Sequence, residues 1–346
     1  MKSVVLSGIK ELTIEDRPVP TVGPTGALVK VEVCGICGSD LHAYLTGDIF
    51  PIGTVMGHEC AGTVVEVGGQ VERFQPGDRV AVYGGSKCGK CPPCQRGLSH
   101  HCVEALDRAV GCSPEMAGGY AEYVWVPDAD TMLVQMPDGL SFEVASLTDP
   151  VASALRPVRL SRFRPGDAVA VLGAGPIGLM AIQLLRLGGA AQIIATEISP
   201  QRSAIARELG ADVVLNPIEE GDGLAAKVAG MTGELGVDVV FECSGVPAAF
   251  QQAFGLVRPG GQIMSVGIIE RSTEIQPLDI VFHEIELRGS MMYTAHEYGL
   301  ALDLLSQGRI KTDQYISGSI DLDQIEELGF KRLLSAPDVV KILVRP

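Results

Sequence analysis

The sequence predicts an α/β protein that also contains a separate β-rich part. Residues 1 to about 130 show short stretches of alternating apolar and polar residues, separated by glycine and proline turns. From Val169 onward, apolar strand-like runs alternate with helix-like segments, a pattern typical of a parallel sheet covered by helices on both faces. The chain has 346 residues, which is long enough for two domains that each have a core.

In the β-rich part, a period of two residues marks the strands, and Gly68-Gly69 and Pro76-Gly77-Asp78 mark turns. The strands that we expect here are 28–33, 63–67, 80–82 and 118–126. Short strands at this spacing favour a twisted antiparallel barrel or sandwich. A turn at Pro137-Asp138-Gly139 then precedes a helix that starts near Ser141 and leads to Asp149-Pro150.

The alternating part carries the elements of a doubly wound sheet. The expected strands are 169–172, 193–196, 212–215, 237–241, 262–266 and 285–288. The expected helices are 176–187, 200–209, 223–231 and 247–257. The uncharged run Ala168 to Leu185 has nearly the length of a membrane span, but three glycines and a proline interrupt it. We therefore interpret it as a buried strand, a turn and a buried helix.

The composition excludes several classes of partner. A formal charge of -15 repels phosphate backbones and anionic membranes, so we expect neither nucleic acid nor membrane as a partner. The first ten residues contain no apolar segment of signal-peptide length. Nine cysteines, an odd number, favour reduced thiols and metal ligands over a disulfide framework. These observations predict a cytoplasmic protein.

A glycine-rich turn predicts a dinucleotide site in the alternating part. Gly173-Ala174-Gly175-Pro176-Ile177-Gly178 follows a predicted strand and opens a predicted helix, which is the context of a Rossmann fingerprint. Glu197 ends the next strand, where a carboxylate accepts hydrogen bonds from the ribose hydroxyls and repels a 2′-phosphate, so NAD is the expected cofactor. Arg202 complicates this expectation, because it could contact the ribose or its phosphate. Val266 and Gly267, at the end of a later strand, are further expected cofactor contacts.

A second motif predicts a structural zinc site. Four thiols follow one another at spacings of three, three and eight residues, interleaved with glycine and proline: Cys88, Cys91, Cys94 and Cys102. Four thiolates form the tetrahedral donor set of a structural zinc ion. The alternative is four unrelated surface thiols. His100 and His101 lie in the same loop, and we expect them to be solvated because the four thiols already complete the set.

A third motif predicts a catalytic zinc site between Cys37 and Glu59. Cys37 and His58 are donors that zinc prefers, and catalytic zinc takes three protein ligands and leaves one position open. Asp40 can orient the ring of His58, while Ser39 and His42 can carry a proton. Packing roles, or a redox role for Cys34-x-x-Cys37, remain alternatives for these residues when they are taken alone.

Together, these motifs and the Gly118-Gly119-Tyr120-Ala121-Glu122-Tyr123 segment resemble the zinc-dependent medium-chain alcohol dehydrogenases, over nearly the whole chain. The resemblance implies a GroES-like catalytic domain, residues 1–150, with the structural zinc loop. It implies a Rossmann NAD-binding domain, residues 151–290, and a C-terminal segment, residues 291–346, that completes the catalytic domain.

The resemblance also implies residue roles. Cys37 and His58 match two ligands of the catalytic zinc, Ser39 and His42 match the proton path, and Asp40 matches the partner of His58. The third ligand departs from the family pattern, because this chain has Asp149-Pro150 where relatives have cysteine or Glu-Pro. We assign the position to Asp149 and keep Glu59 as a reserve ligand. The four cysteines match the ligands of the structural zinc, which gives two zinc ions per subunit.

These roles predict hydride transfer from a secondary alcohol, diol or polyol to NAD, with a ketone as product. Met292 stands where sorbitol dehydrogenases have an arginine, which hints at a less polar pocket, closer to butanediol or simple secondary alcohol dehydrogenases. Threonine and cyclic alcohols are alternative substrates, and reduction of a carbonyl is the alternative direction. A different class of function is a zinc- and NAD-binding module without turnover. The resemblance further suggests a homodimer or homotetramer, with the strand near residues 285–292 in the subunit contact.

Overall fold

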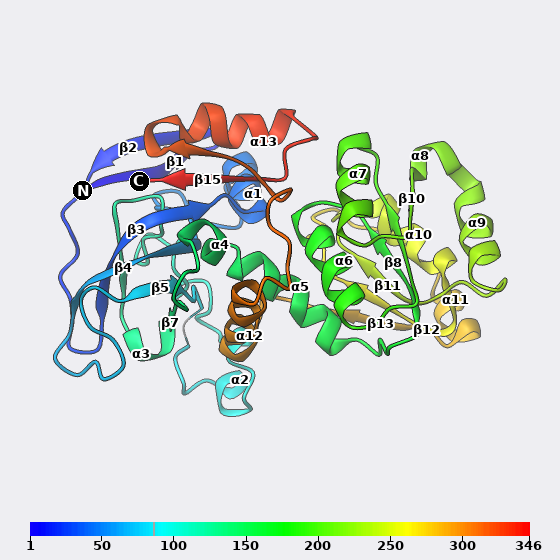
Figure 1. Cartoon of the computed structure of the whole chain (residues 1–346), viewed down its shortest axis with the longest axis horizontal. Coiled ribbons are helices and arrows are strands. Elements are labelled where there is room, and N and C mark those ends of the chain that lie inside the picture. The colour runs from blue at the N-terminus through cyan, green and yellow to red at the C-terminus, as the bar shows by residue number, and fades with distance from the viewer. Residues whose placement is uncertain (86) are drawn as a thin grey trace. The chain divides into compact units, whose positions relative to one another are not determined.

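The structure is a computed structural model that describes residues 1–85 and 87–346, which fold into two compact units. The first unit comprises Met1–Asp149, Tyr293–Gly308 and Thr312–Pro346, and the second comprises Pro150–Met292 and Arg309–Lys311. The chain leaves the first unit within helix α5 (Thr148–Leu160). Both termini belong to the first unit (Figure 1).

A seven-stranded sheet forms the centre of the first unit, with the order β14-β15-β3-β4-β5-β7, and β6 also pairs with β3. Its pairs are antiparallel, except that β14 and β15 run parallel. A separate hairpin consists of β1 (Lys2–Gly8) and β2 (Glu11–Asp16). The strands of the sheet are β3 (Ala27–Gly35), β4 (Glu59–Val67), β5 (Arg79–Val82), β6 (Tyr123–Val126), β7 (Leu133–Gln135), β14 (Ile316–Asp321) and β15 (Lys341–Arg345).

Strands lie at each of the four places where the two-residue period predicts them, but β6 covers only Tyr123–Val126 of the expected range 118–126. Strand β4 begins at Glu59, four residues before the predicted start. Its first four residues are all buried, so no polar face alternates with an apolar one there. The C-terminal strand β15 inserts beside β3 (Figure 1), which places Lys341 next to the chain that leads to Cys37.

Short helices connect these strands. They are α1 (Gly38–Thr46), α2 (Pro92–Gln95), α3 (Ala129–Met132), α4 (Phe142–Ser146), α12 (Ala295–Ser306) and α13 (Arg332–Ser335). Two 3₁₀ turns, η1 (Ser99–His101) and η3 (Leu322–Gln324), and a π-helical segment, η4 (Ile325–Lys331), complete the unit.

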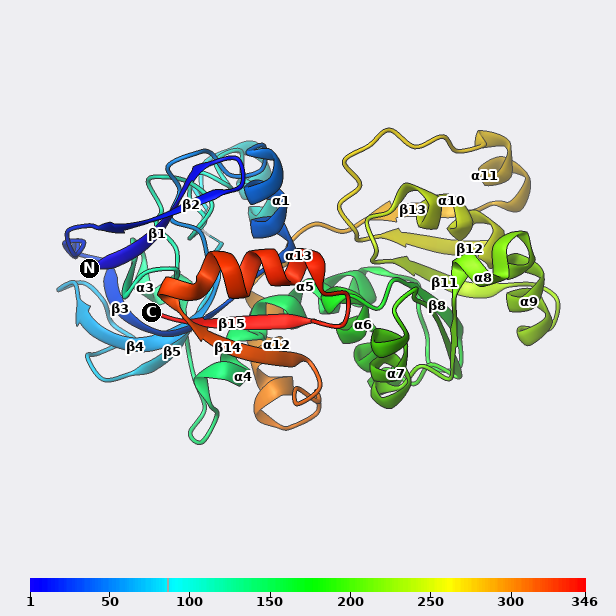
Figure 2. The ribbon, with the colours of Figure 1, turned by 90° about the horizontal axis from the view of Figure 1, so that it is seen from above.

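A six-stranded parallel sheet forms the second unit, with the order β10-β9-β8-β11-β12-β13. Helix α6 packs with α7, and α9 packs with α10, and Figure 2 shows these two pairs on opposite faces of the sheet. The strands are β8 (Ala168–Leu172), β9 (Gln192–Thr196), β10 (Val213–Leu215), β11 (Val237–Glu242), β12 (Val257–Ser265) and β13 (Glu286–Gly289). The helices are α6 (Pro176–Leu187), α7 (Pro200–Leu209), α8 (Pro217–Glu220), η2 (Gly221–Gly223), α9 (Leu224–Met231), α10 (Pro247–Leu256) and α11 (Pro277–His283).

The expected parallel sheet with helices on both faces is confirmed. Helices α6 and α7 match the predicted ranges at both ends, because each has proline at its first position and glycine directly after its last. Strand β12 begins at Val257 and not at Gln262, since Gly260-Gly261 interrupts its apolar pattern. Helices α8 and α11 were not among the predicted elements.

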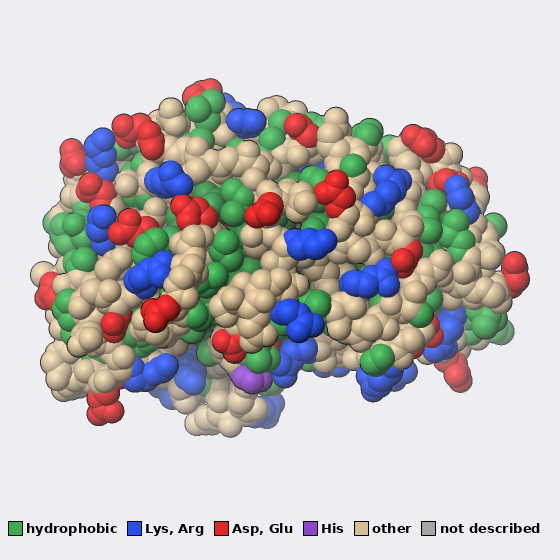
Figure 3. Space-filling model, viewed as in Figure 1, with side chains coloured by type: hydrophobic (Ala, Val, Ile, Leu, Met, Phe, Trp, Pro, Cys, Tyr) green, Lys and Arg blue, Asp and Glu red, His purple; other side chains and the backbone are tan. Residues whose placement is uncertain are grey.

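The uncharged run from Ala168 divides into β8 and α6, as predicted. Among the described helices, none is long and apolar enough to cross a membrane. The acidic charge is dispersed: on the face drawn in Figure 3, Asp and Glu side chains are scattered among Lys and Arg side chains.

Candidate active site and metal centres

Helix α1 positions four of the predicted site residues. Cys37 is its N-cap, and the backbone N–H of Cys37 donates to Asp40 Oδ2 at 2.9 Å, which fixes the first turn. Ser39 and Asp40 lie in that turn, and the half-buried His42 follows in the next. A single cap therefore holds a thiol, a hydroxyl, a carboxylate and an imidazole on one short segment.

The turn before β4 brings His58 to the same place. Gly57 has φ 96°, and a Cβ atom on it would lie 2.7 Å from the ring of Tyr120 and 2.9 Å from Cys34 Sγ. Only glycine meets both the backbone angle and the lack of space. Because β4 starts one residue after His58, the strand fixes the imidazole and the carboxylate of Glu59 together.

These segments form a group of metal-ligand atoms. One ligand atom each from Cys37, His58 and Glu59 lies within 4.8 Å of the other two. Ser39 Oγ lies 3.4 Å from His58 Nε2. A thiol, an imidazole and a carboxylate within this distance fit the donor set of a zinc ion.

Asp40 holds the other side of the His58 ring. Its Oδ1 lies 3.6 Å from His58 Nδ1, and its Oδ2 accepts hydrogen bonds from the Tyr120 hydroxyl at 2.7 Å and from Cys37 N. Burial raises the pKa of Asp40, although His58 and Tyr120 oppose this shift. Burial lowers the pKa of His58, but the charges of Asp40 and Cys37 outweigh it, so the net shift of the His58 pKa is upward. The distance of 3.6 Å is that of an ion pair and not of a hydrogen bond, and a carboxylate at this place fits a partner for a metal-binding histidine.

Asp149 lies in the first turn of α5 and is buried. Its Oδ2 accepts a hydrogen bond from the Tyr293 hydroxyl, and burial is the main reason that its pKa rises to about 6. In the described chain, the three grouped ligand atoms include Glu59 and not Asp149. The grouping by distance thus includes the reserve ligand Glu59, while the Tyr293 hydroxyl donates to Asp149. Asp149 as the third ligand stays a prediction.

Glu59 has a second partner, Lys341 on β15. Lys341 Nζ donates to both Oε1 and Oε2 of Glu59 at 2.7 Å, and to the carbonyl of Ile36 at 2.8 Å. Both side chains are only 1% exposed. Burial alone lowers the pKa of Lys341, but the Glu59 carboxylate raises it above its ordinary value. Removing one partner from such a buried pair costs about 3–5 kcal/mol, since the other charge is left uncompensated.

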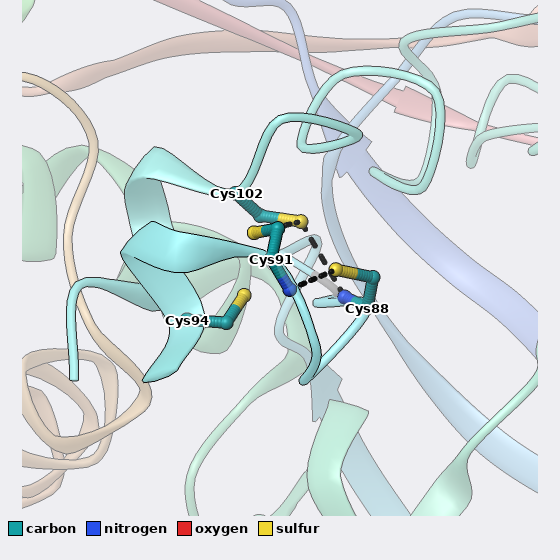
Figure 4. A group of neighbouring side chains, drawn as sticks. All are labelled: Cys88, Cys91, Cys94 and Cys102. Carbon is teal, nitrogen blue, oxygen red and sulfur yellow. Dashed lines mark hydrogen bonds between the residues drawn. The ribbon is translucent and has the colours of Figure 1, made fainter. Parts of the chain in front are cut away.

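The four predicted loop cysteines form a second group. Their sulfur atoms turn toward one another (Figure 4) and all lie within 4.8 Å. The N–H of Cys88 donates to Cys102 Sγ at 3.4 Å, and the N–H of Cys91 donates to Cys88 Sγ at 3.3 Å. Backbone N–H groups of Val103 and Cys94 lower the pKa of Cys91 to about 6. Four thiols with this geometry fit a structural zinc ion.

One expectation for this loop is wrong. His100 is buried, with 5% of its surface exposed, whereas His101 is exposed as expected. Both lie in the 3₁₀ turn η1, where consecutive side chains point about 120° apart, and only the direction of His101 leads to solvent. The rings lie 4.2 Å apart between their centroids.

The glycine turn in the second unit fits a dinucleotide. A Cβ atom on Gly178 would lie 1.9 Å from the carbonyl oxygen of Gly173, so glycine is required for the helix to pack against the turn. Gly175 is the N-cap of α6, and Pro176 and Ile177 are its first residues. The N-terminus of a helix attracts a pyrophosphate. At the end of β12, the N–H groups of Val266 and Gly267 both donate to the carbonyl of Glu242 at 2.9 Å.

Glu197 stands directly after β9 and is tied to the glycine turn. Its Oε2 accepts from Ala174 N, and its Oε1 accepts from Ile198 N and Ser199 N, all at 2.9 Å. These three bonds leave the carboxylate fewer free acceptor positions for ribose hydroxyls than we expected from the sequence. Its negative charge nevertheless lies beside the glycine turn. Arg202 is in the first turn of α7, and its N–H donates to Ser199 Oγ.

Three site residues were not predicted from the sequence in these roles: Tyr120, Tyr293 and Lys341. Each donates to a buried carboxylate of the site, on Asp40, Asp149 and Glu59 respectively. Lys341 is the one with a visible signal, since it interrupts the apolar run Val339-Val340-Lys341-Ile342-Leu343-Val344. The two tyrosines carry no such signal, because buried tyrosine is common in cores.

A β-rich unit with two zinc-type donor groups and a parallel sheet with a dinucleotide turn define a zinc-binding dehydrogenase. The chain matches the alcohol dehydrogenase GroES-like domain over residues 23–138 and the zinc-binding dehydrogenase family over residues 176–307. It belongs to the family of zinc-dependent medium-chain alcohol dehydrogenases, which are oxidoreductases that act on alcohols.

Several relatives match the chain from end to end. It is 39% identical to the (R,R)-butanediol dehydrogenase of Bacillus subtilis, with 100% of both chains covered. It is 35% identical to the sorbitol dehydrogenase of the same organism, covering 100% of this chain and 97% of the relative. A solved structure of a zinc-binding dehydrogenase from Sinorhizobium meliloti, bound to NADP, is 35% identical with a TM-score of 0.91, covering 100% of this chain and 99% of that one.

Proposed function

We propose that the chain oxidises a small secondary alcohol, of the diol or polyol class, to a ketone with NAD as hydride acceptor. The observation that carries this proposal is the meeting of Cys37, His58 and a carboxylate beside the hydroxyl of Ser39. A zinc site with a purely structural or binding role would need the metal ligands but not the Ser39 hydroxyl. The four-cysteine cluster takes the second zinc ion, whose role is to hold its loop.

The site residues divide the work. A zinc ion held by Cys37, His58 and a carboxylate supplies Lewis acidity toward an alcohol oxygen. Ser39 Oγ would accept the hydroxyl proton of the substrate while it gives up its own proton, and His42, on the next turn of α1, would carry that proton to solvent. Asp40 keeps the His58 ring in one orientation through Nδ1. A bound nicotinamide supplies the hydride acceptor.

NAD is the proposed cofactor because Glu197 places a negative charge beside the glycine turn. A 2′-phosphate at that position would be repelled. The NADP bound to the Sinorhizobium meliloti structure makes this a point to test. Replacing Glu197 with serine should raise the rate with NADP relative to NAD by about tenfold, the effect of about 1.4 kcal/mol. An unchanged ratio would contradict the role of Glu197.

The proposed substrate class follows from two relatives, a butanediol dehydrogenase and a sorbitol dehydrogenase. We favour a short diol or simple secondary alcohol over a polyol, since Met292 offers a polyol no charge and no hydrogen-bond donor.

We further propose a cytoplasmic homo-oligomer, a dimer or a tetramer, that joins at the edge strand β13. This strand has a single neighbour, β12, among the described strands. Apolar side chains on and beside it are exposed, including Leu287, Val281, Phe282 and Met291. An unpaired edge with apolar neighbours suits pairing with a second copy. Phe282→Glu should lower the mass measured by sedimentation, and a wild-type chain that sediments as a monomer would contradict the proposal.

The direct test is NADH formation by zinc-loaded protein across 2,3-butanediol, simple secondary alcohols, sorbitol, xylitol, threonine and a cyclic alcohol. A rate with 2,3-butanediol or another secondary alcohol supports the proposal. A control reaction runs the corresponding ketones with NADH, because the equilibrium also allows carbonyl reduction. No turnover in either direction, with NAD still bound, would favour the non-catalytic alternative.

A further inference from the structure

The two carboxylates beside Cys37 and His58 differ in what holds them. The ammonium group of Lys341 has three N–H donors, and it uses two on the oxygens of Glu59 and the third on the carbonyl of Ile36. Both oxygens of Glu59 are therefore engaged by a full positive charge. Since both side chains are 1% exposed, water hardly screens this attraction.

Asp149 is held differently. The Tyr293 hydroxyl donates to one of its oxygens, Oδ2, and a hydroxyl carries no net charge. The positive charge of Lys341 also attracts Asp149, but the three N–H donors of its ammonium group are used on Glu59 and Ile36. Releasing Glu59 breaks an ion pair in direct contact, whereas releasing Asp149 breaks the hydrogen bond from Tyr293.

Distance and hydrogen bonding thus favour different ligands. Distance favours Glu59, which lies within 4.8 Å of the Cys37 and His58 donors. Hydrogen bonding favours Asp149, because its partner is a neutral hydroxyl and not an ammonium group. Lys341 itself is fixed, because β15 pairs with the end of β3 and the N–H of Ile36 donates to the carbonyl of Ile342 at 3.0 Å. If the ammonium group followed Glu59, it would lose its hydrogen bond to the carbonyl of Ile36.

We propose that Lys341 is a positioning residue that selects the third zinc ligand: it holds Glu59 back and leaves the coordination position to Asp149. This inference rests on the proposed zinc site at Cys37 and His58. It assigns Lys341 a role beyond stabilising the fold. When Lys341 is removed, Glu59 becomes a permanent ligand.

The test is the zinc affinity of the catalytic site, measured by competition with a chelator while the four-cysteine cluster stays filled. Asp149→Asn should weaken binding about 100-fold, because it removes a ligand. Lys341→Met should tighten binding about tenfold or more, because it frees Glu59. In the combined variant Lys341→Met/Asp149→Asn, Glu59 takes the vacant position, so the affinity should recover at least about tenfold over Asp149→Asn alone.

The matched control is Lys341→Met/Glu59→Gln, which removes both buried charges and should bind zinc within about threefold of the wild type. The visible spectrum of the cobalt-substituted protein gives a second readout, which should change with Lys341→Met and return toward the wild type in the control. Normal zinc binding by Asp149→Asn, or no recovery in the combined variant, would overturn the proposal.

Two further comparisons distinguish a failure of the Lys341 proposal from a failure of the proposed function. If Lys341→Met does not fold, Asp149→Asn still tests the proposal, because it leaves the buried pair intact. Cys37→Ser tests the zinc site itself: if it keeps both zinc ions, the proposed function fails. If it loses one zinc ion while Asp149→Asn does not weaken binding, only the role of Lys341 fails.

Discussion

The two metal-type sites of the first unit are built in different ways. The four cysteines come from one loop, and the contacts between them are thiols and backbone N–H groups of that loop. The donors around His58 come from separate segments, and a distant residue contacts each carboxylate: Tyr120 at Asp40, Lys341 at Glu59 and Tyr293 at Asp149.

This difference indicates that the four-cysteine site contributes to stability, whereas the site at His58 contributes to catalysis. A local set of four thiolates is closed to further ligands once zinc is bound, so it can only hold its loop together. A site with three protein ligands keeps one position open, and partners from elsewhere must fix those ligands. The following changes test this division, from the largest expected effect to the smallest.

Cys37→Ser should reduce alcohol oxidation about a thousandfold, because the Lewis acid is worth several kcal/mol. The midpoint of thermal unfolding should change little, since the hydroxyl fills nearly the same space. Steady-state rates and calorimetry on the same sample check both expectations. If Cys37→Ser oxidised alcohol at a rate within tenfold of the wild type, the site at Cys37 would not be the catalytic one, and the proposed difference between the two sites would be wrong.

Cys94→Ser should show the opposite pattern. Loss of a structural metal costs about 4 kcal/mol of stability, so calorimetry should show a clear fall in the unfolding temperature. Protein that is still folded at low temperature should keep most of its turnover. Unfolding unchanged from the wild type would show that the cluster is not structural.

Asp40→Asn should weaken zinc binding at the catalytic site about 10- to 100-fold, the usual effect of losing the partner of a metal-binding histidine. The amide keeps the size of the side chain, and the four-cysteine cluster serves as the internal control. Equal loss from both sites would point to general destabilisation.

Zinc affinity at the catalytic site should begin to fall at a pH above the ordinary pKa of histidine. The pKa of His58 is raised above 6.5, so its proton competes with the metal at higher pH. Below that raised pKa, the affinity should fall about tenfold per pH unit. Asp40→Asn should move the fall to lower pH, because Asp40 is the main group that raises this pKa. A chelator titration at several pH values measures this dependence. A zinc affinity that does not change between pH 5 and pH 8 would contradict the protonation of His58.

Tyr120→Phe should have the smallest effect. It removes one hydrogen bond to Asp40 and leaves the bond from Cys37 N. The expected loss of zinc affinity is about fivefold, which corresponds to about 1 kcal/mol. A loss as large as that of Asp40→Asn would mean that Tyr120 also holds the backbone at Gly35, to which its hydroxyl lies at 3.3 Å.

Local patterns in the sequence predicted most elements of the fold. Proline at the first position and glycine after the last predicted α6 and α7 at both ends. The start of β4 was less visible, because a strand buried on both faces has no alternation to detect. The cysteine loop was complete in the sequence, since all four thiols lie within fifteen residues.

The contacts around the carboxylates were not visible in the sequence. Lys341 lies 282 residues from Glu59, and Tyr293 lies 144 residues from Asp149. Only the pairing of β15 with β3 places Lys341 beside Ile36 and Glu59. The sequence therefore supplied both candidate ligands, Asp149 and Glu59, but not the partners that distinguish them.

The central claim is that zinc at Cys37 and His58 is required for alcohol oxidation. The most direct measurement follows zinc content and NADH formation together while a chelator removes the more accessible metal ion. The rate should fall in proportion to the loss of one zinc ion per subunit and return when zinc is added, with the cysteine cluster still filled. A chain that keeps its rate after losing that zinc ion would contradict the account.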